Sequence, residues 1–141
     1  MDWYLKIKVL ELLLFLVDIN ISEYEEVKRY FYKEQVQQIK AIHRYMTTHL
    51  KEHITQEALS KKFNFPITSM KNCFKGVYGC SIYSYMKTYR VQAARVQLIE
   101  TDLSITEIAA DMGYENPSKF SEAFKKELGI TPSEFRKSLS K

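Results

Sequence analysis

Apolar residues recur along most of this chain at spacings of three and four, the period of a helix with one buried side. One such series runs from Val36 to Leu50, and it predicts a helix that ends near Leu50 or Lys51. The same period predicts further helices over residues 67–78, 81–102 and 132–139. No long stretch alternates at every second residue, so the pattern predicts an all-α fold and argues against a sandwich or barrel.

Residues 103–139 carry the pattern of a helix-turn-helix unit. Ile108, Ala109 and Met112 form one apolar side of a short helix, and Gly113 can supply the positive φ of the reversal that follows. Phe120 and Phe124 lie four residues apart and give the next helix an inward stripe. The polar residues around them then cover the outer surface, as in the motif that places a helix in a DNA groove.

Residues 36–79 contain a second copy of this unit. Leu59-Ser60 corresponds to Ile108-Ala109, Asn64 to Gly113, Phe74-Lys75 to Phe124-Lys125, and Gly79 to Gly129. The offset changes from 49 to 50 within the turn, so the later unit has one extra turn residue. The chain is therefore predicted to hold two helix-turn-helix units.

A long helix is predicted between the units, over residues 81–102. About 20 residues at 1.5 Å rise span about 30 Å, which is close to the roughly 34 Å helical repeat of DNA. A strut of that length can hold two recognition helices in successive major grooves.

Start and stop signals mark several of these helices. Thr55 is placed as an N-cap, and Pro66 stops the helix that follows it. Ser104-Ile105-Thr106-Glu107 and Thr131-Pro132-Ser133-Glu134 have the spacing of capping boxes.

Residues 1–35 differ from the rest of the chain. Residues 2–18 carry more apolar side chains than the exterior helix of a small domain usually shows, and residues 20–34 are polar and acidic, as in a connector with some helix. The apolar helix is expected to pack on the chain itself, to form a homodimer interface, or to cover a missing companion domain. Its abrupt start favours the last two alternatives and a fragment of a longer polypeptide.

Charge and composition narrow the function classes. Residues 1–35 have five basic and seven acidic side chains, whereas residues 36–141 have 16 and 10, so the net charges are −2 and +6. The positive balance favours nucleic acid modestly. Two cysteines, Cys73 and Cys80, form no disulfide framework, and no signal peptide or membrane span is evident. A cytoplasmic protein is expected.

The residues from Ile108-Ala109 through Gly113-Tyr114, Phe120-Ser121 and Phe124-Lys125-Lys126 to Gly129-Ile130-Thr131-Pro132 closely resemble the signature of the AraC/XylS family of bacterial transcription regulators. The resemblance covers about residues 36–139. It implies seven helices that bind double-stranded DNA as one module, usually at the C-terminal end of a protein whose other domain senses an effector or dimerises. If the protein is an activator, RNA polymerase is an expected partner.

The resemblance also implies which side chains meet DNA. The candidates for base contacts are Thr68, Lys71, Asn72, Ser118, Ser121 and Glu122. The candidates for phosphate contacts are Thr55, Lys75, Ser104, Lys119, Lys125 and Lys126. Lysines neutralise the backbone without distinguishing sequence, whereas Lys71 suits guanine and Asn72 suits adenine.

Two of these positions depart from the family pattern, which often has Arg where this chain has Asn72 and Glu122. Asn72 changes the preferred base. Glu122 can accept a hydrogen bond from cytosine N4. Alternatively, phosphate can repel Glu122, and the unit at residues 103–139 then discriminates DNA sequence more weakly than the unit at residues 36–79.

Other functions have weaker support. No phosphate loop, nucleophile elbow, zinc-protease pair or converging carboxylate cluster is present, so an enzyme, a cofactor and a metal are not expected. His49 and His53 lie four apart without a third ligand, and a redox switch between the cysteines is a minor hypothesis. Arg90 and Arg95 are expected to bind phosphate or to pair with acids. The alternative is a helical protein-interaction module with a basic surface.

Overall fold

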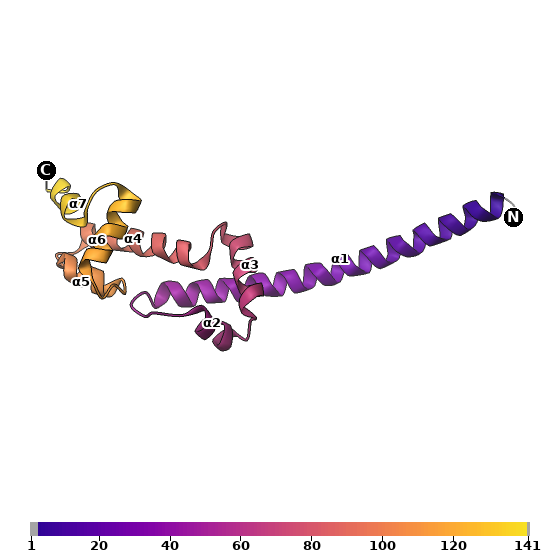
Figure 1. Ribbon diagram of the computed structural model, residues 1–141, viewed down its shortest axis with the longest axis horizontal. Coiled ribbons are helices and arrows are strands. Elements are labelled where there is room, and N and C mark those ends of the chain that lie inside the picture. Colours follow the sequence, from indigo (N-terminus) through magenta and orange to yellow (C-terminus); the bar gives the residue numbers. More distant parts are fainter. Residues whose placement is uncertain (1–2, 141) are drawn as a thin grey trace. The chain divides into compact units, whose positions relative to one another are not determined.

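The structure is a computed structural model that describes the backbone of residues 3–140 and the side chains of residues 5–17 and 32–140. It is all-α, with no strand among these residues (Figure 1). The helices are α1 (Trp3–Thr48), α2 (Gln56–Phe63), α3 (Ile67–Tyr78), α4 (Ile82–Glu100), α5 (Ile105–Asp111), α6 (Pro117–Leu128) and α7 (Pro132–Ser138). No helix in this part of the chain combines the length and the apolar sequence that a bilayer span requires.

The chain divides into two compact parts, an N-terminal part, Met1–Gln37, and a C-terminal part, Gln38–Lys141. Helix α1 belongs to both, since it is continuous over 46 residues. The polar connector expected over residues 20–34 is therefore helical. The physical reason is that the chain has no proline or glycine before Pro66, so no residue forces the helix to end there.

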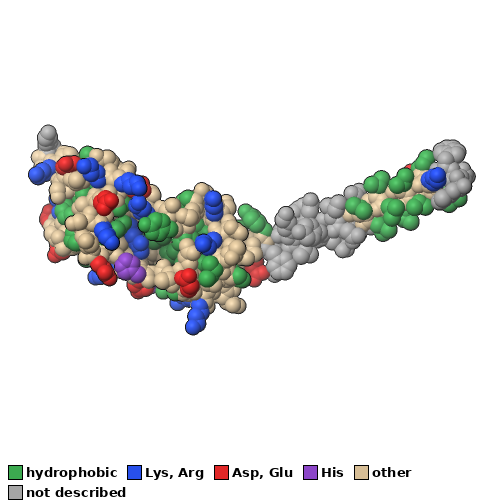
Figure 2. Space-filling model, viewed as in Figure 1, with side chains coloured by type: hydrophobic (Ala, Val, Ile, Leu, Met, Phe, Trp, Pro, Cys, Tyr) green, Lys and Arg blue, Asp and Glu red, His purple; other side chains and the backbone are tan. Residues whose placement is uncertain are grey.

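In the N-terminal part, the described side chains of α1 leave a large apolar surface in contact with solvent. Ten apolar side chains of residues 5–17 are exposed, with exposed fractions from 44% to 66%. Figure 2 shows them as a green band with few charges. Residues 2–4 and 18 of the predicted apolar helix lie outside the described side chains.

Two hydrophobic cores organise the C-terminal part, residues 38–141. The first joins the end of α1 to α2, α3 and the start of α4, and Phe74, Met70 and Ile42 at its centre are fully buried. The second joins the rest of α4 to α5 and α6, around the fully buried Phe120, Phe124 and Ile108. The predicted inward faces of both helix-turn-helix units are thus confirmed.

Helix α4 contributes to both cores. Ile82 and Met86 pack in the first core, whereas Val91, Ala94 and Leu98 pack in the second. With 19 residues, α4 is about 28 Å long at 1.5 Å per residue. The predicted linker helix is therefore present, and it is slightly shorter than expected.

The ends of the helices repeat between the units, as the sequence predicted. Asn64 and Gly113 both have positive φ, 49° and 82°. Gly79 and Gly129 end α3 and α6 in the same left-handed conformation, with φ of 80° and 82°. Left-handed caps of this kind satisfy the last carbonyls of a helix and turn the chain sharply. The repeat in the sequence is therefore also a repeat in the backbone.

Candidate nucleic-acid interface

Helix α3 presents the predicted DNA contacts of the first unit to solvent. Met70 and Phe74 are fully buried on its inner side. The exposed side chains on its outer side include all four candidates of this helix, Thr68, Lys71, Asn72 and Lys75. Since its inner residues anchor α3 to the core, the outer four form one polar and basic surface.

Helix α6 has a corresponding surface with one difference. Phe120 and Phe124 are fully buried, and Ala123 is nearly so. The exposed candidates on this helix are Ser118, Lys119, Glu122, Lys125 and Lys126. Ser121 is only half-buried rather than exposed, so it is the least accessible of the proposed base contacts.

The two hydroxyls proposed for phosphate contacts both cap helices. Thr55 Oγ1 accepts a hydrogen bond from Ala58 N at 3.1 Å, at the start of α2. Ser104 Oγ accepts from Glu107 N at 3.1 Å, at the start of α5. The hydroxyls of Thr55 and Ser104 each keep their own hydrogen for donation to a phosphate oxygen. The two predicted capping boxes, at Ser104 and Thr131, are confirmed.

The capping box of α5 makes its N-terminus different from that of α2. Ser104 N donates to the Glu107 carboxylate at 2.7 Å, so this amide is already occupied. The hydrogen bond from Ser104 N lowers the pKa of Glu107 and keeps its negative charge beside the helix end. Ser104 can therefore offer phosphate its hydroxyl but not its backbone amide, and Glu107 opposes the approach of an anion.

A contact between the two helix-turn-helix units was not predicted. An added Cβ at Gly113 would lie 2.7 Å from Leu50 O and 3.3 Å from Lys51 O, so the α5–α6 turn packs directly against the backbone after α1. Beside it, Lys51 Nζ lies 3.9 Å from Asp111 Oδ1. Gly113 thus serves both the turn and this close approach, whereas the sequence indicated only the turn.

Arg90 contributes a further link at this junction. Its Nη2 donates to Glu52 O at 3.4 Å, and its Nε is buried without a hydrogen-bond partner. The sequence left Arg90 and Arg95 between phosphate binding and pairing with acids. In the structure, Arg95 Nη1 donates to Gln92 Oε1 at 3.4 Å. Neither hydrogen bond involves an acidic side chain.

The remaining polar candidates lie apart. His49 Nδ1 bonds to Tyr45 O at 2.7 Å, whereas His53 is exposed. No group of three His, Cys, Asp or Glu side chains suited to a metal occurs among the described residues. Cys73 packs against the first core, as predicted, and burial raises its pKa. Both cysteines are free thiols.

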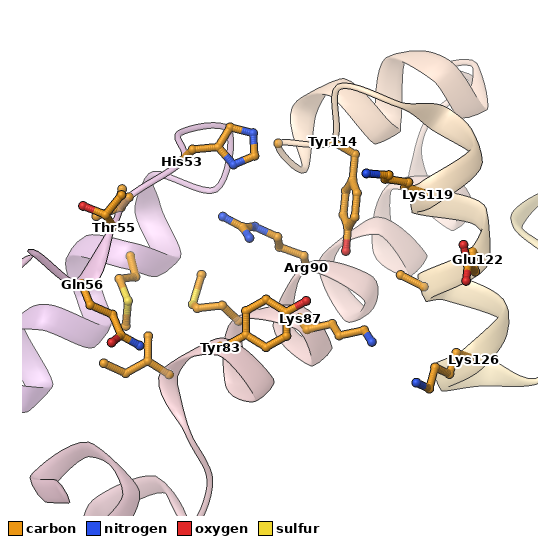
Figure 3. A pocket seen from close by; sticks show the side chains of 16 residues that line it. His53, Thr55, Gln56, Tyr83, Lys87, Arg90, Tyr114, Lys119, Glu122 and Lys126 are labelled. Atoms are coloured by element: carbon orange, nitrogen blue, oxygen red, sulfur yellow. The ribbon is translucent and has the colours of Figure 1, made fainter. Parts of the chain in front are cut away.

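A cavity of about 590 Å³ lies between the two helix-turn-helix units. Its walls come from the end of α1, the residues that lead into α2, the first half of α4, the α5–α6 turn and one side of α6 (Figure 3). Arg90, Tyr83 and Lys87 project from α4, and Lys119 and Glu122 belong to α6 on the opposite wall. Four of the proposed DNA contacts, Thr55, Lys119, Glu122 and Lys126, therefore also border this cavity.

Tyr114 at this junction is partly buried. Burial raises the pKa of Tyr114, and the charge of Arg90 acts in the opposite direction without overcoming it. The phenol therefore stays protonated and available as a hydrogen-bond donor. This cavity could not be predicted from the sequence, because its walls come from segments tens of residues apart.

Comparison with known proteins agrees with this geometry. A family described as a helix-turn-helix domain matches residues 59–138, which include α3, α4, α5 and α6 in full. Solved structures with the same arrangement include DNA-binding domains of AraC type. The chain belongs to the AraC family of transcription regulators.

AraC-family relatives extend beyond this chain. It is 33% identical over 128 residues to an uncharacterised helix-turn-helix transcriptional regulator, YdiP, of Escherichia coli, covering 87% of this chain and 42% of YdiP. It is 34% identical over 92 residues to the lactose operon transcription activator of Staphylococcus xylosus, covering 65% of this chain and 33% of that protein. The chain thus spans less than half the length of these two relatives.

The solved structures include the C-terminal domain of AraT, a response regulator from Geobacillus stearothermophilus. It is 27% identical to this chain, with a TM-score of 0.68, and the match covers 72% of this chain and 84% of that one. The predicted AraC-family fold is confirmed, as are DNA binding and transcription regulation as the function of the family to which the chain belongs.

Proposed function

We propose that residues 38–141 bind double-stranded DNA through α3 and α6, which enter successive major grooves. The observation that carries this proposal is the duplicated unit on one shared helix. Each unit buries an aromatic side of its second helix and exposes a polar, basic side. Helix α4, about 28 Å long, is comparable with the roughly 34 Å repeat of DNA.

The contacts divide by chemistry. Lys71 and Asn72 are proposed to contact bases, because their donors match guanine and adenine edges in the major groove. Lys75, Lys119, Lys125 and Lys126 are proposed to contact phosphates, with hydrogen bonds from Thr55 and Ser104. Of the second unit's base candidates, Ser118 is exposed, Ser121 is half-buried and Glu122 is negative. The first unit is therefore proposed to contribute more of the sequence discrimination.

Salt dependence of DNA affinity tests the phosphate contacts. Four lysines that each neutralise one phosphate give a slope of about −3.6 in a plot of log affinity against log salt. Replacing Lys125 with Gln removes one contact and should make the slope shallower by about 0.9. The matched control is Lys40→Gln, since Lys40 is also exposed but lies on α1, outside α3 and α6. If Lys125→Gln leaves the slope as unchanged as Lys40→Gln does, the assignment of Lys125 to a phosphate is contradicted.

Base contacts are tested by comparing duplexes selected from a random pool with unrelated duplexes. Lys71→Ala and Asn72→Ala should each weaken binding to the selected duplex by about 1–3 kcal/mol and relax the preference at one base position. Binding to unrelated duplexes should change far less. Equal losses on both kinds of duplex would favour the alternative, a basic surface that binds acidic partners without sequence discrimination.

The exposed apolar surface of α1 supports a second element of the proposal, self-association. Leu5, Val9, Leu12 and Leu16 are all exposed and lie at spacings of four, three and four. That alternation is the seam of a two-helix coiled coil. A second copy of the same helix can cover it, and the resulting homodimer would bring two DNA-binding modules together.

The wider regulatory role also belongs to the proposal. We infer that a companion domain senses an effector, that an activating form contacts RNA polymerase, and that the protein works in the cytoplasm beside its DNA. The family membership and the transcription activator among the relatives support this inference. The chain spans only 33% of that activator, so these functions involve parts of a regulator beyond the module described here.

A further inference from the structure

The cavity between the two helix-turn-helix units has the composition of a ligand site. Its volume of about 590 Å³ falls within the roughly 300–1,000 Å³ of small-molecule pockets. Its apolar lining is formed by Met46, Ile54, Ile82, Met86 and Ala123. A phosphate group alone would contact little of this lining, whereas a ligand with an apolar body could pack against it.

The charged lining favours an anion. The cations at the cavity are Lys87, Arg90, Lys119 and Lys126, and the carboxylate is Glu122. With histidine neutral, these described side chains sum to +3. No ion pair between Glu122 and one of these cations is present in the described structure to reduce that balance. A negative group in the cavity would therefore be attracted from two walls, α4 and α6.

Arg90 supplies a specific donor for that negative group. Its side chain is anchored by the hydrogen bond from Nη2 to Glu52 O at 3.4 Å, and its buried Nε has no partner. Arg90 lines the cavity, and a carboxylate is the group that a guanidinium binds best, often through two parallel hydrogen bonds. Figure 3 shows Arg90 projecting from α4 between His53 and Tyr114.

We propose that this cavity binds a small aromatic carboxylate, with the carboxylate on Arg90 and the ring on the methionine-lined floor. The aromatic character follows from Tyr83 and Tyr114, which flank the cavity, and from Met46 and Met86, because sulfur and aromatic rings make favourable contacts. The site lies inside the DNA-binding module itself. It is therefore separate from any effector site in a companion domain.

Occupancy of this site has a consequence for DNA binding, and this step rests on the proposed function. Lys119 and Lys126 are proposed phosphate contacts that also border the cavity. A bound anion neutralises part of their field and occupies space beside α6. The ligand should therefore weaken DNA binding through the second unit.

Methionine methyl groups provide a test on the full chain without DNA. Met46 and Met86 line the cavity, whereas Met70 and Met112 are buried elsewhere and serve as internal controls. In a chain labelled with 13C at the methionine methyls, 2-naphthoate should shift the signals of Met46 and Met86 and leave those of Met70 and Met112 in place. The uncharged 2-naphthamide should bind at least tenfold more weakly.

A pair of arginine variants tests the role of Arg90. Arg90→Gln should lower the affinity for 2-naphthoate about tenfold, towards that for 2-naphthamide, and leave the affinity for the amide nearly unchanged. Arg95→Gln is the matched control, because Arg95 is exposed on the same helix and does not border the cavity. Unchanged Met70 and Met112 signals show that each variant is folded.

Three outcomes would overturn the proposal. The first is the absence of Met46 and Met86 shifts at millimolar 2-naphthoate. The second is equal binding of the acid and the amide, which would remove the role of charge. The third is an equal effect of inorganic phosphate, which would make the cavity a phosphate pocket of the DNA interface. Displacement of a labelled duplex by 2-naphthoate is measured separately, so a failure of DNA binding leaves the methyl result intact.

Discussion

Replacement of Gly113 by alanine should destabilise the second unit more than any other glycine substitution in a helix cap. Gly113 has φ of 82°, and a residue with a Cβ costs about 1–2 kcal/mol in that conformation. The new Cβ would also lie 2.7 Å from Leu50 O, and overpacking of this kind costs about 1–3 kcal/mol. Together these effects lower the free energy of unfolding by about 2–5 kcal/mol.

Gly129→Ala is the matched control for this substitution. Gly129 also has φ of 82°, but nothing lies within 4 Å of an added Cβ. Its loss should be the conformational part alone, about 1–2 kcal/mol. The difference between the two variants therefore isolates the contact between Gly113 and the backbone after α1.

Urea unfolding measures this difference. With an m value of about 1–3 kcal/mol per molar urea, an extra loss of about 2 kcal/mol lowers the midpoint of Gly113→Ala by about 1 M relative to Gly129→Ala. Equal midpoints would show that the α5–α6 turn does not pack against Leu50 in solution. A full loss of cooperative unfolding in Gly129→Ala would refute the assumed cost of the left-handed conformation.

Three further predictions follow from separate parts of the chain. Leu12→Glu should convert a self-associating chain to a monomer in sedimentation equilibrium, because it places a charge on the proposed seam; a wild-type monomer would contradict the seam itself. Ser104→Ala should lower the free energy of unfolding by about 1 kcal/mol through loss of the α5 cap, whereas Ser133→Ala, at an exposed position that caps no helix, should change it little. Burial lowers the pKa of His43, so the unfolded chain takes up its proton first as pH falls. Stability should then decrease as pH falls below the ordinary histidine pKa towards the depressed one, and His43→Gln should reduce that dependence in pH-resolved urea melts.

The helices after residue 50 could be predicted closely because their ends carry local signals. Thr55, Ser104 and Thr131 cap helices in the structure as their sequence context indicated. The left-handed conformation of Asn64 followed from its place opposite Gly113 in the repeat. Such features depend on neighbours within four residues, and those neighbours are visible in the sequence.

The continuity of α1 was missed for a different reason. The acidic, polar composition of residues 20–34 indicated a connector, although the segment holds no residue that breaks a helix. Composition describes solvation, whereas a helix ends only when a break is stabilised by a cap, a turn residue or a proline. The absence of proline and glycine from this segment was the better signal.

The junction between the units could not be predicted from the sequence. The contact of Gly113 with Leu50 O joins residues 63 positions apart, and Arg90 Nη2 meets Glu52 O across 38 positions. Such contacts depend on how the packed units dock, and no local pattern records that. The exposure of the candidates on α3 followed from helical period alone, whereas the partial burial of Ser121 depends on neighbouring packing.

Because α4 packs in both cores, its length fixes how far one helix-turn-helix unit is rotated relative to the other about the α4 axis. Ile82 and Met86 belong to one core, and Val91 and Ala94 to the next. Inserting one residue between Met86 and Val91 would rotate everything beyond it by about 100° and advance it by 1.5 Å. The second core would keep its internal packing but turn relative to the first, and α6 would face away from the groove. Length changes are therefore tolerable in the turns, where the two units already differ by one residue, but not in the strut that spaces them.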